Sequence, residues 1–79
     1  MNLEEKTEEE ITELITGKKI TFVRKIATAE ETVHVRSSVS VYTEGSGERC
    51  VRFVSPEGWR FIGLADIIKI GKKTYNKEN

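Results

Sequence analysis

An unbroken alternation of apolar and polar positions over residues 33–42 constrains the fold of this 79-residue chain more than any other feature. Four of the five odd positions are valines, whereas the even positions carry His34, Arg36, Ser38, Ser40 and Tyr42. Because successive side chains of a β-strand point to opposite faces, the pattern predicts one long strand with an apolar face and a polar face. We expect a bend at Ser37 and Ser38, as in strands that cross from one side of a small barrel to the other.

Shorter segments of the same period, separated by turn-forming residues, lie on both sides of this strand. A first strand is expected to hold Ile20 and Phe22 on one face. The later strands are expected at residues 49–54, 59–64 and 67–70. The connecting loops, turns and breaks are expected at residues 27–32, 44–48, 55–58 and 65–66. The sequence therefore predicts five short antiparallel strands.

Helical spacing replaces the alternation near the N-terminus. Thr7 and Glu10 match a capping box, in which each side chain accepts a hydrogen bond from the other's backbone, and Gly17 supplies a stop. The apolar residues between them that recur at helical spacing are Ile11, Leu14 and Ile15. We therefore expect an acidic helix over residues 8–16.

The length is that of one domain, which we place over residues 1–79. Within it, residues 1–6 are expected to fray, residues 18–70 to form a β-barrel, and residues 71–79 to be a flexible tail or a short extension. The predicted fold class is mainly β (α+β), an N-terminal helix followed by a five-stranded, strongly bent antiparallel small barrel.

In this order of elements the chain resembles the Sm-like and SH3-like small barrels over roughly residues 8–70. The segment 60–70, Arg-Phe-Ile-Gly-Leu-Ala-Asp-Ile-Ile-Lys-Ile, looks like the end of such a barrel. RNA-binding Sm-like proteins carry an Asp-hydrophobic-Asn signature after their second strand, where this chain has Thr-Glu-Gly-Ser-Gly at 43–47. Their Arg-Gly pair is replaced by Leu64 and Ala65. The resemblance implies the fold without the uridine pocket.

Charge is divided unevenly along the chain, although the formal net charge is +0. Residues 1–16 hold six acids and one base, whereas the remaining residues hold 12 bases and 7 acids. The acidic helix has two interpretations. It packs its apolar stripe against one end of the barrel, or it lies across a basic surface and competes with an anionic ligand.

The sequence offers few parts for chemistry. His34 and Asp66 are the only histidine and aspartate, and no nucleophile elbow or glycine-rich phosphate loop is present. Cys50 is the only cysteine, which excludes an internal disulfide and a multi-thiolate metal site within one chain. We expect Cys50 to be a half-buried packing residue, the alternative being a reactive thiolate beside Arg49 and Arg52. The prediction is a protein that is not an enzyme and uses no cofactor or metal.

Two sets of side chains are candidates for contact with a partner. The first joins basic and aromatic residues of two strands paired through the 55–58 turn, and its members are Arg49, Arg52, Trp59, Arg60 and Phe61. The second lies on the polar face of the long strand and comprises His34, Arg36 and Tyr42. Trp59 and Phe61 share a face, and the alternative to partner contact is that this face belongs to the core. We expect the core position for Phe61 and leave both interpretations open for Trp59. The alternative for the second set and for Arg60 is ordinary solvation.

We therefore expect a non-catalytic binding module, regulatory or adaptor in role, that contacts another protein through an edge strand or the Trp59 face. Nucleic-acid binding by the basic surface is one alternative, and a self-assembling oligomer joined through edge strands is the other. The chain contains no run of 18 apolar residues and its first residues are acidic, so we expect no membrane contact and a cytoplasmic location.

Overall fold

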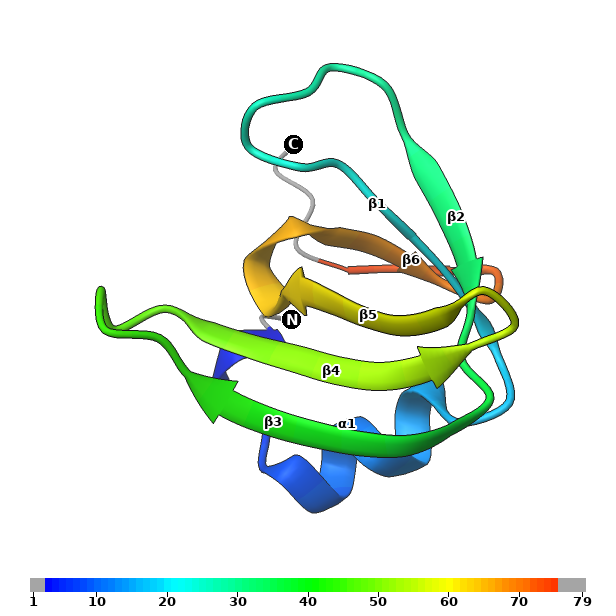
Figure 1. The fold of residues 1–79 in the computed structure, drawn as a ribbon, viewed down its shortest axis with the longest axis horizontal. Helices are drawn as coiled ribbons and strands as arrows, with labels where there is room; N and C mark the ends of the chain where they lie inside the picture. Colours follow the sequence, from blue (N-terminus) through cyan, green and yellow to red (C-terminus); the bar gives the residue numbers. More distant parts are fainter. Residues whose placement is uncertain (1–2, 76–79) are drawn as a thin grey trace.

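The computed structural model describes residues 3–75, which form a mainly β fold with one α-helix and two antiparallel sheets (Figure 1). In chain order the elements are η1 (Leu3–Glu5), α1 (Glu8–Ile15), β1 (Lys19–Phe22), β2 (Glu31–His34), β3 (Ser37–Thr43), β4 (Arg49–Ser55), β5 (Gly58–Gly63), η2 (Leu64–Asp66), β6 (Ile67–Ile70) and β7 (Lys73–Thr74). Sheet A has the strand order β2-β1-β6-β7, and sheet B has the order β3-β4-β5.

The helix forms as its sequence predicts. The Thr7 hydroxyl accepts a hydrogen bond from the Glu10 amide at 3.1 Å, and the Glu10 carboxylate accepts one from the Thr7 amide at 2.9 Å, which completes the capping box. Ile11 and Ile15 are fully buried, so the helix turns its apolar stripe into the core. Its last residue is Ile15, and Gly17 follows with the positive φ of 79° that favours glycine.

The two sheets face each other across one core, and α1 lies along β3 (Figure 1). Sheet A contributes Ile20 and Phe22, and sheet B contributes Val51 and Phe53, all of them fully buried. Leu14 of the helix and the half-buried valines of β3 pack against this cluster. Strand pairing does not close the sheets into a barrel within residues 3–75, so only the mainly β part of the predicted fold is found.

The prediction of one continuous strand over residues 33–42 is wrong. The Val35 amide donates to the carbonyl of Lys18 at 2.9 Å, whereas the next amide, that of Arg36, donates to the carbonyl of Val54 at 2.9 Å. The backbone therefore leaves the side of sheet A and joins sheet B between two neighbouring residues. The bend expected at the serines is present, because Ser38 has a φ of 60° and the pairing of β3 with β4 shifts register between Ser37 and Ser40.

Both ends of the chain are more ordered than expected. Leu3 of η1 is fully buried, because η1 packs against η2 and the Leu3 side chain belongs to the core cluster. At the other end, β7 pairs with β6, and Tyr75 is buried and donates its amide to the carbonyl of Ile68 at 2.9 Å. The predicted fraying therefore does not hold for residues 3–6. Residues 71–75 form the short extension that was the alternative to a flexible tail, and the other residues of both segments lie outside the described residues.

Candidate partner-binding face

Sheet B turns two aromatic side chains to the outside. Trp59 and Phe61 share a face of β5, as expected, and each is 54% exposed, whereas Ile62, the residue after Phe61, is buried. The expectation that Phe61 belongs to the core is therefore wrong. Ile62 packs inward as part of the core cluster. Because side chains alternate along a strand, the odd-numbered residues Trp59 and Phe61 then point outward.

The pairing of the three strands gathers further side chains around these rings. Arg52 of β4 is paired with Phe61, and its guanidinium lies 5.8 Å from the centre of the Trp59 ring. Tyr42 of β3 meets Phe61 edge to face, with ring centres 6.4 Å apart and planes at 77°. We call the outward surface formed by Tyr42, Arg52, Trp59 and Phe61 the aromatic face. The hollow between Ser40, Tyr42, Arg52 and Phe61 on this face has a volume of ≈ 440 Å³.

Two arginines predicted to join this face act elsewhere in the fold. Arg49 reaches toward the N-terminus, where one guanidinium nitrogen donates to the carbonyls of Glu4 and Lys6, both at 2.7 Å. Arg60 alternates with the exposed rings and turns inward, where its guanidinium lies 5.9 Å from the centre of the Phe22 ring and 3.4 Å from a carboxylate oxygen of Glu31. Both side chains join separate parts of the chain, so neither lies on this face, and the structure does not show the alternative of ordinary solvation for Arg60.

The second predicted set is divided between the two sheets. His34 is exposed on β2 opposite Lys19, Arg36 is exposed in the link to β3, and Tyr42 belongs to the aromatic face. The division follows from the change of sheet after Val35, which ends the shared face that a continuous strand would have given. His34 and Arg36 therefore do not form one strip with Tyr42.

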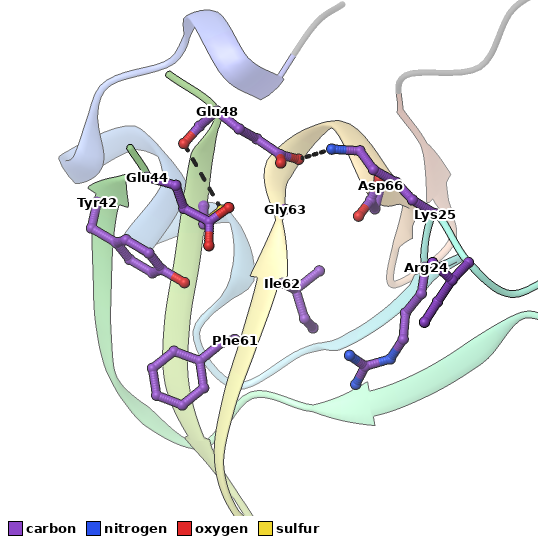
Figure 2. Close-up of a pocket in the computed structure, with 11 residues that line it drawn as sticks. Arg24, Lys25, Tyr42, Glu44, Glu48, Phe61, Ile62, Gly63 and Asp66 are labelled. Carbon is purple, nitrogen blue, oxygen red and sulfur yellow. Dashed lines mark hydrogen bonds and ion pairs between the residues drawn. The ribbon is translucent and has the colours of Figure 1, made fainter. Parts of the chain in front are cut away.

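A second groove, of ≈ 240 Å³, adjoins the aromatic face and shares Tyr42 and Phe61 with it (Figure 2). We call it the acidic groove, because the carboxylates of Glu44, Glu48 and Asp66 line it. Its opposite wall is the segment 24–26 between β1 and β2. The Lys25 ammonium lies 2.6 Å from a carboxylate oxygen of Glu48.

Gly63 of β5 makes room for the acidic groove. A Cβ atom at this position would lie 2.5 Å from a carboxylate oxygen of Glu48 and 3.0 Å from one of Asp66, so any larger residue would displace these side chains. Sequence reasoning missed the groove, since its residues come from four separate segments. A glycine inside a predicted strand was the one available signal of a close approach.

Cys50, Tyr42 and Asp66 of the acidic groove are biased toward their protonated forms. Burial raises the pKa of the Cys50 thiol, and the carboxylates of Glu44 and Glu48 raise it further. Burial also raises the pKa of Tyr42 and of Asp66. Cys50 is 4% exposed, so it is more buried than expected, and its raised pKa favours the packing role over a reactive thiolate.

Ligand atoms of Glu44, Glu48 and Cys50 lie within 4.8 Å of one another, close enough to hold a cation together. Two features disfavour a metal ion there. The thiol must lose its proton to bind a metal, against its raised pKa, and Glu48 is already paired with Lys25.

No protein-family model matches the chain, and neither the curated proteins nor the solved structures gave a match. Among residues 3–75, no helix has the length and apolar character needed to cross a membrane.

Proposed function

We propose that this protein is a non-catalytic binding module of the small-barrel class, with a regulatory or adaptor role, and that it contacts another protein through the aromatic face. The exposure of Trp59 and Phe61 carries the proposal. Two large exposed rings on one sheet face form an apolar patch, and such patches mark sites of interaction with a partner. Trp, Tyr and Arg are the residues that dominate protein–protein hot spots, and the face combines all three.

The order of the elements supports the barrel assignment. The 3₁₀-helix η2 separates β5 from β6, and β6 pairs with β1, so the last long strand returns to the first. Arg60 of β5 and Glu31 of β2 bring the unpaired sides of the two sheets together through side chains. These two contacts are our support for a small, partly open barrel of the Sm-like or SH3-like kind.

The edge of β3 is less suited to strand addition. The Val41 amide, which points away from β4, donates to a carboxylate oxygen of Glu8 at 2.8 Å. The helix therefore occupies one of the donors that an added strand would need. This contact favours the aromatic face over the β3 edge as the route to a partner.

Phosphate binding has less support at this face. Arg52 is its single basic side chain, and the adjoining groove carries three carboxylates. Proteins that hold single-stranded nucleic acid combine stacking rings with a continuous basic groove. A negatively charged groove beside the rings works against a phosphate backbone.

Photo-crosslinking from the aromatic face tests the proposal. A photoreactive phenylalanine analogue replaces Phe61 in cells that produce the protein. The same analogue at Thr12, a half-buried position of α1 that does not line the aromatic face, is the control. We expect a discrete protein adduct from position 61 that is absent from position 12 and is lost when Trp59→Ala is added. A nuclease-sensitive adduct, an adduct with a second copy of the chain, or no adduct at position 61 would each overturn the proposal.

A further inference from the structure

The acidic groove opens at the edge of the aromatic face, so a partner seated on Phe61 also meets the groove (Figure 2). Tyr42 and Phe61 belong to both surfaces. The chemistry of the groove therefore indicates what the partner must carry next to its apolar contact.

Negative charge is in excess in this groove. Its two basic side chains are already matched, because Arg24 lies 3.0 Å from a carboxylate oxygen of Glu31 and Lys25 lies 2.6 Å from one of Glu48. Among the described residues, Glu44 and Asp66 have no ion pair with a lysine or an arginine. The exposed Glu44 carboxylate thus lies at the groove without a basic partner within residues 3–75, whereas Lys25 acts on the half-buried Asp66 at a longer distance than an ion pair.

Of the neighbouring groups, Cys50 reports the negative charge of the groove. For Asp66, burial is the largest cause of the raised pKa, and the effects of Lys25, which lowers the pKa, and of Glu48, which raises it, oppose each other. The pKa of the Cys50 thiol is raised in the same way by burial and then by Glu44 and Glu48. A cation placed beside Glu44 and Glu48 would lower the pKa of the Cys50 thiol, because these two carboxylates are the charges that add to the effect of burial there.

The groove also has an apolar wall that suits a long side chain. Phe61 and Ile26 line it and are among the most exposed large hydrophobic residues of the described chain. Lysine and arginine carry an aliphatic stem that packs on apolar surface and a cation that stays near charge and water. An aromatic ring adds attraction for that cation when it lies over the ring.

We propose that the acidic groove binds a lysine or arginine side chain of the partner protein, with the cation beside Glu44 and the stem against Phe61 and Ile26. The inference rests on the proposed function, since it takes the partner to be a protein that covers the aromatic face. The inference goes beyond the proposed function by specifying that the segment of the partner that enters the groove is basic.

A titration with a single amino-acid side chain tests the groove without knowledge of the partner. The ligand is Nα-acetyl-lysine amide, and the matched control ligand is Nα-acetyl-norleucine amide, which has the same stem without the ammonium group. We follow the backbone amide resonances of the ¹⁵N-labelled full chain at constant salt. The lysine derivative is expected to shift the amides of Glu44, Gly63 and Asp66 saturably and to bind about fivefold or more tightly than the norleucine derivative.

A pair of variants separates the groove from general surface charge. Glu44→Gln is expected to weaken binding of the lysine derivative about fivefold, as the loss of one favourable charge contact of about 1 kcal/mol predicts. Glu9→Gln, on the exposed side of α1, removes the same charge elsewhere and is expected to leave binding unchanged. Well-dispersed spectra of both variants show that they are folded.

Three results would overturn the inference. They are equal binding of the lysine and norleucine derivatives, binding that Glu44→Gln leaves unchanged, and shifts of the same amides by micromolar Zn²⁺ without a response to lysine. If any of these occurs while position 61 still yields a protein adduct, only the basic nature of the contact is wrong. If the adduct is also missing, the proposed function fails with it.

Discussion

Arg49 and Arg52 show how position decides the role of one residue type. They lie three residues apart on β4, yet Arg49 reaches the carbonyls of Glu4 and Lys6 while Arg52 lies over the exposed Trp59 ring. The first contact joins the N-terminal turn to sheet B. The second keeps a cation on the surface that we propose for the partner.

Arg49→Ala is expected to destabilise the protein by about 1–3 kcal/mol, because two carbonyls lose a charged donor. Arg52→Ala is the matched control and is expected to change the free energy of unfolding by about 0.5 kcal/mol or less. Urea denaturation followed by Trp59 fluorescence measures both. Equal losses for the two variants would contradict the role of Arg49 as a link to the N-terminal turn.

Phe53 and Phe61 provide a second contrast, because the first is fully buried and the second is half exposed. Phe53→Ala is expected to cost about 3–5 kcal/mol of stability, the range for large core truncations. For Phe61→Ala we expect a loss of stability of about 0.5 kcal/mol. When the photoreactive analogue replaces Trp59 instead of Phe61, Phe61→Ala is also expected to abolish the protein adduct. A large loss of stability on Phe61→Ala would show that its ring serves the fold.

Asp66 gives a pH dependence of defined sign. Its pKa is raised in the folded state, chiefly by burial, so the folded chain holds this proton more tightly than the unfolded chain. The resulting stabilisation is complete below the unfolded pKa and is lost as the pH rises through the folded pKa. Asp66→Asn is therefore expected to raise the melting temperature at pH 7 by more than it does at pH 3. An equal rise in melting temperature at pH 7 and pH 3 would show that ionisation of Asp66 is not the cause of the stabilisation.

At the scale of elements, α1 stabilises itself locally and also covers an edge. Its capping box satisfies backbone amides of the first turn, and the Glu8 carboxylate accepts from the Val41 amide of β3. An uncovered edge strand is a template for pairing with another chain. The helix therefore contributes to both stability and the control of association.

Glu8→Ala removes the acceptor for the Val41 amide and is expected to increase self-association through β3. Sedimentation at several protein concentrations measures the average mass. Glu9→Ala, one residue further along the exposed side of the helix, is the control and is expected to stay at the mass of the parent protein. Identical masses for both variants would mean that Glu8 does not protect the edge.

At the scale of the whole molecule, the acidic N-terminal part cannot be separated from the core. Leu3, Ile11 and Ile15 are fully buried among residues of both sheets. The interpretation in which the apolar stripe of α1 packs against the β part is therefore confirmed. The acidic side chains of α1 remain outside, on a helix whose other side belongs to the core.

Deletion of residues 1–16 is expected to unfold the protein, because it removes these three core side chains and both partners of Arg49. Near-ultraviolet circular dichroism and amide resonance dispersion measure the loss. A truncated chain that keeps native spectra would show that the β part folds without its helix. In that case, the N-terminal part would be an addition to the fold.

Much of the local structure could be predicted from the sequence. The capping box at Thr7, the shared face of Ile20 and Phe22, and the turns around β4 depend on neighbouring residues, and the structure confirms them. The bend at the serines was predicted, but the break of the strand after Val35 was not, because both halves keep the same alternation. Periodicity reports which residues share a face only as long as the strand stays in one sheet.

The aromatic face and the acidic groove were decided by tertiary structure. The sequence by itself determined that Trp59 and Phe61 share a face, whereas the packing of Ile62 into the core decided that this face is outside. Likewise, Glu44 and Asp66 line one groove only because strand pairing brings their segments together. Local periodicity follows from backbone geometry, but burial depends on which surfaces meet, and that is a property of the whole fold.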